Sequence, residues 1–159
     1  MINHENTSSD RHEYWMKQAL RLAEIASENN EIPVGALIIS NENIVGKGFN
    51  QTETLLDPTA HAEILAITAA ANTLQDWRLD GCTLYVTKEP CAMCAGAINN
   101  ARLTQVVFGC YDGEEGCCGS LYSLCGDPHL GSKVAVLGGV LADSCGQLLQ
   151  SFFKSRRKT

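Results

Sequence analysis

The chain has 159 residues, 45% of them hydrophobic and 19% charged, which fits one globular domain large enough to bury its own core. Its net charge of −6 argues against a surface that coats nucleic acid generally, so any basic patch must be local. No apolar run approaches the length of a membrane span, and the polar start MINHENTSSD lacks a signal-peptide region, so we expect a cytoplasmic protein without membrane association.

The first predicted element is an amphipathic helix. Residues 1–9 are polar and are expected to be disordered. Asp10 and Glu13 then have the spacing of a capping box, and apolar residues recur at intervals of three and four up to Ala26.

Strand and helix patterns alternate over the rest of the chain. The predicted strands are short apolar runs bounded by turn residues, and the predicted helices are alanine-rich or amphipathic. In chain order they are a hairpin of IPVGALIIS (32–40) and IVGKGFN (44–50), a helix in HAEILAITAAANTL (61–74), a strand in CTLYVT (82–87), a helix in PCAMCAGAINNAR (90–102), opened by Pro90 at its first position, strands in QVVFGC (105–110) and KVAVLGGV (133–140), and a final helix over 142–158. This alternation predicts a single α/β domain over residues 1–159, a mixed sheet with helices on both faces.

Residues 111–132 are rich in Gly, Cys and Asp, and are predicted to form a long surface segment with at most one helical turn. Four cysteines in or beside this segment suggest either a second metal site or small apolar side chains. They are Cys110, Cys117, Cys118 and Cys125. Packing is the favoured interpretation, because their spacing repeats no established ligand pattern.

Two other cysteines have the spacing of metal ligands. Eight cysteines are many for a reducing compartment, which favours metal binding or inert burial over disulfides. Cys91 and Cys94 lie three positions apart at a predicted helix start, and His61 lies at the start of another. Together they supply three ligands of a tetrahedral zinc site and leave the fourth position for water. A redox-active C-x-x-C is the alternative, but a proline precedes it and no thioredoxin-like pattern surrounds it.

Glu63, two residues after His61, is the candidate proton shuttle. Bound zinc lowers the pKa of its water toward neutrality, and a nearby carboxyl that does not ligate the metal can carry protons. The order H-x-E followed by P-C-x-x-C is the signature of zinc-dependent nucleobase deaminases.

The sequence resembles the bacterial tRNA-specific adenosine deaminases over nearly its whole length. The stretches that carry the resemblance include HEYWMKQALRLA, EIPVGALII, DPTAHAEILA, EPCAMCAGAI and LADSCGQLLQSFFKSRR. The resemblance implies a cytidine deaminase-like three-layer sandwich with a mixed five-stranded sheet, and one zinc ion per chain held by His61, Cys91 and Cys94. It also implies hydrolysis of an amidine C–N bond, in which zinc-bound hydroxide converts the wobble adenosine of a tRNA to inosine and Glu63 shuttles the protons.

The resemblance further implies a homodimer, the tRNA anticodon loop as partner, and contact between Asn50 and the substrate base. From the residues alone, Asn50 is equally well a turn residue at the end of a strand.

The basic end of the chain is a candidate contact for the RNA backbone. It consists of Lys154, Arg156, Arg157 and Lys158, after an apolar stretch of Leu148, Leu149, Phe152 and Phe153 that is expected to pin the last helix to the core. The alternative is a solvated helix end, where cations interact favourably with the helix dipole.

Three functions are therefore compared. The basic end and the near full-length resemblance favour a tRNA substrate. A deaminase of a free nucleobase or nucleoside, such as cytosine or guanine, is favoured by the acidic net charge. It is also favoured by the acids in DGEEGCC (112–118), where the family usually carries Lys or Arg, and by Gly131-Ser132 in place of an Asn-His pair. An inert RNA-binding subunit on the same fold is the third, and the intact Glu63 argues against it.

Overall fold

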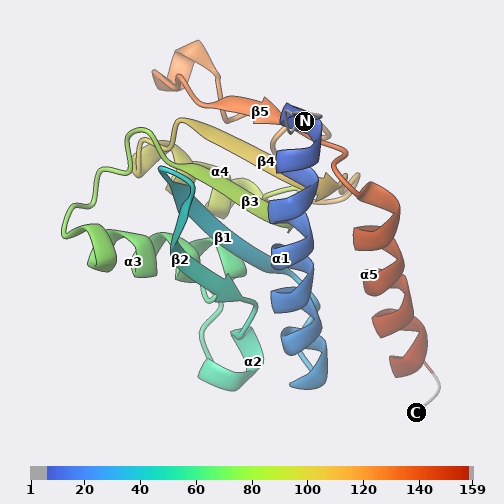
Figure 1. Cartoon of the computed structure of the whole chain (residues 1–159). Helices are drawn as coiled ribbons and strands as arrows, with labels where there is room; N and C mark the ends of the chain where they lie inside the picture. The colour runs from blue at the N-terminus through green and yellow to red at the C-terminus, as the bar shows by residue number, and fades with distance from the viewer. Residues whose placement is uncertain (1–6, 158–159) are drawn as a thin grey trace, which may run out of the picture.

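The computed structural model describes residues 7–157 and confirms the α/β fold (Figure 1). The strands are β1 (Gly35–Ser40), β2 (Asn43–Phe49), β3 (Thr83–Lys88), β4 (Gln105–Cys110) and β5 (Ala135–Leu137). The helices are α1 (Ser8–Glu28), α2 (Thr52–Leu55), α3 (Ala62–Leu74), α4 (Ala92–Asn100) and α5 (Ala142–Arg156), with a 3-10 turn at Pro128–Leu130. Along the described residues, no helix is long and apolar enough to cross a lipid bilayer.

The strands form one mixed sheet in the order β2-β1-β3-β4-β5. Strand β1 is antiparallel to both β2 and β3, whereas β3, β4 and β5 run parallel. The β1–β2 hairpin turns through Asn41 and Glu42, both with positive φ, as a two-residue hairpin turn requires. Parallel strands need long crossovers, and α4 supplies the one between β3 and β4.

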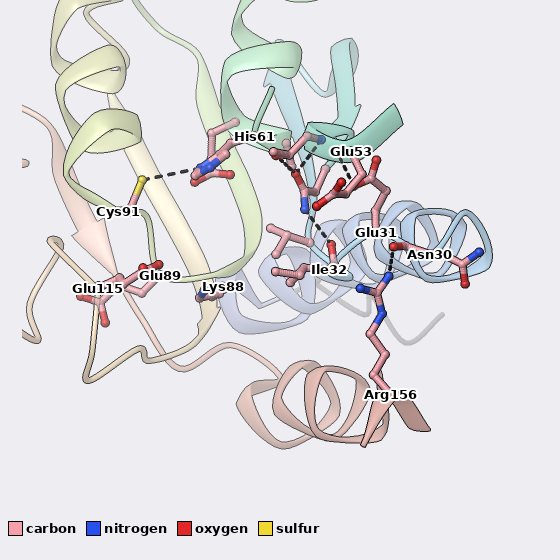
Figure 2. A pocket seen from close by; sticks show the side chains of 15 residues that line it. Asn30, Glu31, Ile32, Glu53, His61, Lys88, Glu89, Cys91, Glu115 and Arg156 are labelled. Carbon is pink, nitrogen blue, oxygen red and sulfur yellow. Dashed lines mark hydrogen bonds between the residues drawn. The ribbon is translucent and has the colours of Figure 1, made fainter. Parts of the chain in front are cut away.

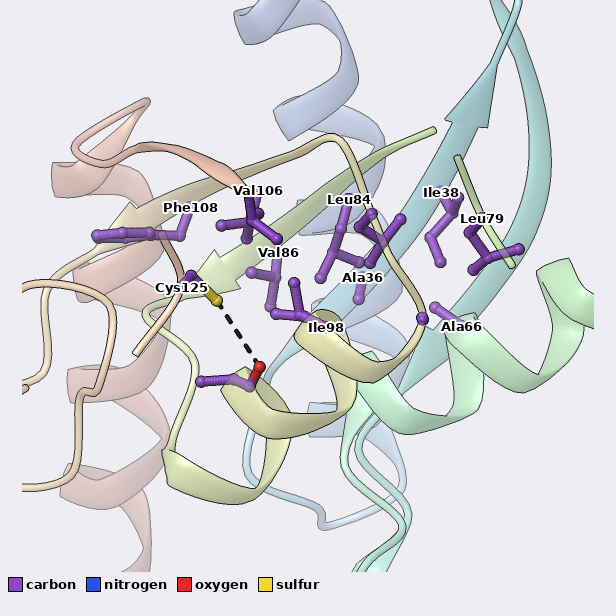
Figure 3. Packing of buried hydrophobic residues seen from close by; sticks show 14 of the residues in the cluster. Ala36, Ile38, Ala66, Leu79, Leu84, Val86, Ile98, Val106, Phe108 and Cys125 are labelled. Carbon is purple, nitrogen blue, oxygen red and sulfur yellow. Dashed lines mark hydrogen bonds between the residues drawn. The ribbon is translucent and has the colours of Figure 1, made fainter. Parts of the chain in front are cut away.

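Helices cover both faces of the sheet, as predicted, and each face has its own core. Because side chains alternate along a strand, Ala36 and Ile38 of β1 face α3 and α4, while Leu37 faces α1 and α5. Figure 3 shows the first of these clusters, in which Ile98 of α4 packs against Val86 and Val106.

Helix α3 lies very close to the sheet because the facing residues are small. A Cβ built on Gly48 of β2 would lie 2.4 Å from the carbonyl oxygen of Ala62, and one built on Gly46 would lie 2.4 Å from that of Ala66. The alanines of HAEILAITAAA therefore serve close packing as well as helix formation. This packing sets the position of the first turn of α3.

Three details differ from the sequence-based expectations at the start of the chain. Helix α1 begins at Ser8 because Thr7 is its N-cap: the Thr7 hydroxyl accepts from the Asp10 amide at 3.2 Å, and the Asp10 carboxylate accepts from the Thr7 amide at 3.3 Å. Asp10 is thus the third helical residue rather than the cap. The expectation of disorder over 1–9 is wrong for residues 7–9, and residues 1–6 lie outside the described residues.

Two further differences concern the segments around the predicted helices. Pro90 precedes α4 instead of occupying its first position, and Cys91 is the N-cap. The short helix α2 was not predicted; it lies between the predicted hairpin and the predicted helix over 61–74.

The predicted anchoring of α5 is correct only in part. Phe152 is buried and Leu148 and Leu149 are half-buried, but Phe153 is 44% exposed and rests edge-on against Phe152. The predicted surface segment 111–132 contains the 3-10 turn, yet its three cysteines are buried in the core on the α3 and α4 side. Those burials support the packing interpretation of Cys117, Cys118 and Cys125.

We expect Gly48→Ala to destabilise the protein by about 1–3 kcal/mol, because the added methyl group meets backbone that must move. Gly96→Ala in α4 is the matched control: apart from its chain neighbours and the backbone of its own helix, no described atom lies within 4 Å of its Cβ, so the change should be neutral or stabilise by up to about 1 kcal/mol. Urea unfolding measures both. Equal effects of the two substitutions would contradict the close packing of α3.

Candidate metal centre

The starts of α3 and α4 meet at the end of the sheet where β3 ends, and they bring three candidate ligands together. Strand β3 ends at Lys88, and the chain turns through Glu89 and Pro90 so that Cys91 is the N-cap of α4 and Cys94 lies in its first turn. His61 is the N-cap of α3. The Cys91 and Cys94 sulfurs lie 3.6 Å and 3.5 Å from His61 Nδ1, respectively. The structure therefore places the three predicted ligands side by side.

The chemistry of this group fits zinc. The ligand atoms of His61, Cys91 and Cys94 all lie within 4.8 Å of one another, and no other such group of His, Cys, Asp or Glu occurs among residues 7–157. Two thiolates and one imidazole nitrogen form a ligand set typical of zinc. Three protein ligands leave one position open, as in catalytic rather than structural zinc sites.

Hydrogen bonding within the group already favours a thiolate without the ion. The hydrogen bond with Cys94, and then that with His61, lowers the pKa of Cys91 to about 3. The hydrogen bond with Cys91 raises the pKa of His61, and together with burial it raises that of Cys94. Both cysteines also lie at the positive end of α4, which stabilises negative charge.

Glu63 lies in the first turn of α3 and is only 4% exposed. Burial raises the pKa of its carboxyl, while its hydrogen bonds to its own backbone amide and to Cys94 act in the opposite direction. A carboxyl whose pKa is shifted toward neutrality can both accept and release a proton near physiological pH. This position fits the proton shuttle predicted from the sequence.

His61, Glu63 and Cys91 line one cavity of about 260 Å³, shown in Figure 2. Its wall also contains Asn50, whose amide is held on both sides: Nδ2 donates to the Ile32 carbonyl oxygen at 3.3 Å, and Oδ1 accepts from the Thr52 amide and hydroxyl at 3.3 and 2.8 Å. Asn50 therefore both stabilises the turn after β2 and lines the pocket. The second Nδ2 proton is the atom that Asn50 can still offer to a base.

The sequence did not indicate several charged residues of the same pocket. Glu89 is buried, and its carboxylate accepts from the amides of Asp112, Cys118 and Ser120 at 3.0, 3.0 and 2.9 Å. Lys88 forms an ion pair with Asp112 at 3.0 Å. Together these bonds fix the acidic loop after β4 against the pocket. In the sequence, the only indication of a role for Lys88 and Glu89 was their position between the predicted strand over 82–87 and Pro90.

The basic residues at the end of α5 that the structure describes occupy different environments. Arg156 lines the pocket and donates a hydrogen bond to the Asn30 carbonyl oxygen (Figure 2). Its guanidinium also lies over the Phe152 ring, 4.5 Å from the ring centroid. Lys154 and Arg157 are exposed on the same helix end, and Lys158 lies outside the described residues. Of the four predicted cations, the structure thus brings Arg156 to the site.

Comparison with known proteins agrees with this site. The model of the cytidine and deoxycytidylate deaminase zinc-binding region matches residues 9–110. A tRNA-specific adenosine deaminase of Bacillus subtilis (strain 168) is 43% identical, over 92% of this chain and 91% of the relative. The chain therefore belongs to the zinc-binding cytidine and deoxycytidylate deaminase family, and within it to the tRNA-specific adenosine deaminases.

Solved structures of deaminases have the same fold. One from a study of A-to-I editing by tRNA:A34 deaminases at the wobble position of transfer RNA has a TM-score of 0.82 and 35% identity, over 85% of this chain and 98% of that chain. A guanine deaminase from Bacillus subtilis has a TM-score of 0.61 and 41% identity, over 63% of this chain and 64% of its own. The cytidine deaminase-like sandwich expected from the sequence is thereby confirmed.

We expect one zinc ion per purified chain. The double substitution Cys91→Ala and Cys94→Ala should remove it, because one imidazole alone binds zinc weakly. Acid should also release zinc progressively, since the ligands must be deprotonated to bind. Elemental analysis of dialysed protein measures both effects.

Cys110→Ala is the control, because Cys110 lies outside the ligand group and should keep the zinc. Stoichiometric zinc in the double variant would show that the ligands lie elsewhere.

Proposed function

We propose that this protein deaminates the wobble adenosine of a tRNA anticodon loop to inosine. The observation that carries the proposal is the pocket in which His61, Cys91, Cys94 and the buried Glu63 meet, in a chain similar over nine tenths of its length to tRNA-specific adenosine deaminases. Water adds to C6 of the adenine, the C6–N6 bond breaks, and ammonia leaves.

In this proposal the three ligands, Glu63 and Asn50 each have a stated task. His61, Cys91 and Cys94 hold the zinc, which when bound makes water acidic enough to supply hydroxide at neutral pH. Glu63 takes one proton of the water and delivers it to the adenine ring nitrogen; it then takes the proton of the hydroxyl added at C6 and delivers it to the leaving amine. Asn50 donates its remaining Nδ2 proton to an acceptor on the base and thereby orients it.

The size of the pocket supports a single base as the reacting group. A cavity of about 260 Å³ has room for one unstacked base. The nucleoside must therefore leave its stack, and anticodon loops are single-stranded segments in which bases can be splayed out.

The proposal extends to the partners. Lys154, Arg156, Arg157 and, beyond the described residues, Lys158 would contact the RNA backbone; the placement of Arg156 at the pocket supports this. We also propose a homodimer, in which both subunits bind the RNA, and a location in the cytoplasm, where tRNA is processed. These three points rest on the similarity to tRNA-specific adenosine deaminases.

A free-base deaminase is the second candidate, because carboxyl groups outnumber cations in the pocket. The acids that line it are Glu31, Glu53, Glu63, Glu89 and Glu115, against Lys88 and Arg156. An acidic wall does not favour RNA phosphates. The partial similarity to a guanine deaminase points the same way.

Substrate tests separate the two candidates. The purified protein is expected to release ammonia from an Arg-anticodon stem-loop and to convert its adenosine to inosine, detected by mass spectrometry. Adenine, cytosine and guanine as free bases should give no ammonia above background. Turnover of a free base without turnover of the stem-loop would contradict the tRNA proposal.

The substitution Glu63→Gln tests whether the activity belongs to this pocket. The amide keeps the shape but cannot carry a proton, so turnover should fall by at least about 10²- to 10⁴-fold. Zinc content and far-UV circular dichroism should stay as in the parent. Activity within about tenfold of the parent would exclude Glu63 as the shuttle.

The exposed cations of α5 test the RNA contact. We expect Lys154→Ala with Arg157→Ala to weaken stem-loop binding and to flatten its salt dependence by about 0.7 log–log units per lost phosphate contact. Lys47→Ala with Lys133→Ala removes the same charge from exposed positions on the sheet and its edge, and is the control. Equal salt slopes for the two double variants would remove this end of α5 from the RNA site.

A further inference from the structure

Glu31 is a buried carboxylate to which the proposed chemistry gives no task. It lies between α1 and β1, lines the pocket, and is 1% exposed. A glutamate is almost never fully buried unless it is paired. Its partners are the Glu53 amide at 3.0 Å, the Thr54 amide at 2.8 Å and the Thr54 hydroxyl at 2.7 Å. These three donors come from the first turn of α2.

Glu31 thereby supplies α2 with the cap that its own sequence lacks. The N-cap residue Gln51 makes no side-chain capping hydrogen bond within residues 7–157. A carboxylate that accepts from the free amides of a helix start stabilises it through both hydrogen bonding and the helix dipole. Burial alone would raise the pKa of Glu31, but the hydrogen bonds from Thr54 and Glu53 hold it below its ordinary value. The carboxylate is therefore charged at neutral pH.

Polar contacts are especially important for α2, because apolar packing does not hold it. None of its four residues is buried, and Leu55 and Leu56 at its end are 51% and 87% exposed. The hydrogen bonds to Glu31 are thus a main attachment of this segment to the rest of the domain.

The same segment holds Asn50. Thr52 donates its amide and hydroxyl to Asn50 Oδ1, and Ile32, the residue after Glu31, accepts from Asn50 Nδ2. Figure 2 shows Glu31, Ile32 and Glu53 together on this wall of the pocket. A shift of residues 52–54 would consequently turn the Asn50 amide away from the base.

We propose that Glu31 is a positioning residue for the substrate base, acting through Thr52 and Asn50. This inference rests on the proposed function of the pocket, because it assumes that Asn50 contacts the base. Arg156 joins α5 to the same wall: it donates to the Asn30 carbonyl oxygen, and its charge favours the ionised form of Glu31. The RNA-contacting helix and the base-contacting loop therefore meet at residues 30 and 31.

The first test is Glu31→Gln. Its single oxygen can still accept from Thr54 or from Glu53, but its NH2 group then faces another donor. We expect kcat/KM for the stem-loop to fall by about ten- to a hundredfold through misplacement of the base, with zinc content unchanged. Glu28→Gln, an exposed glutamate at the end of α1, is the control and should retain the parent's kcat/KM.

A double-substitution cycle with Asn50→Ala tests the route of the effect. If Glu31 acts through Asn50, Glu31→Gln should cost little more in kcat/KM once Asn50 has been removed. A merely structural Glu31 would instead give losses that multiply in the double variant. Such multiplication would overturn the inference.

Amide hydrogen exchange of residues 50–56 tests the wall without any substrate. Exchange should be faster in Glu31→Gln than in the parent or in Glu28→Gln, because the Glu53 or the Thr54 amide loses its acceptor. Unchanged exchange would overturn the inference whatever the substrate is. A parent that fails to deaminate the stem-loop would instead contradict the proposed function.

Thr54→Val keeps these outcomes decisive if Glu31→Gln does not fold. It removes one donor to the carboxylate and leaves the charge in place. Faster exchange of residues 50–56, with a smaller fall in kcat/KM, supports the inference; parent-like values of both contradict it.

Discussion

The site depends on the close approach of α3 to the hairpin strand β2. Gly46 and Gly48 leave no side chain between the strand and the helix backbone, so α3 packs directly on β2 and begins beside the end of β3. Because α4 begins there as well, His61 meets Cys91 and Cys94 without any long or flexible connection. A larger residue in β2 would move one ligand relative to the other two.

Around the ligands, buried carboxylates hold the two loops of the pocket. Glu31 binds the start of α2 on one side, and Glu89 binds the loop after β4 on the other. Each carboxylate accepts hydrogen bonds from backbone amides that have no partner within a helix or strand. These hydrogen bonds replace those that water would make, and so they offset the free-energy cost of burying the charge. The three candidate zinc ligands and these two loops together shape the pocket that we propose a single base enters.

The sequence predicted most of the fold and the reacting group, for physical reasons. The strands and long helices have clear periodicity, and the ligands His61, Cys91 and Cys94 have a spacing that few other structures need. The roles of Glu31 and Glu89 and the contact of Arg156 with Asn30 were missed, because they depend on partners that lie far away in the chain. The start of α1 was misplaced since Thr7 and Asp10 form a capping box as readily as Asp10 and Glu13. Helix α2 carries no periodic signal, as its attachment is polar.

The central claim is that water enters at C6 of an RNA adenosine in this pocket. It is tested most directly by single-turnover reaction of the stem-loop in water enriched in heavy oxygen, followed by mass spectrometry of the nucleosides. The account predicts inosine that carries one solvent oxygen per molecule, formed by the parent and not by Glu63→Gln. Inosine without solvent oxygen, or equal amounts of labelled inosine formed in the same time by the parent and the variant, would contradict it.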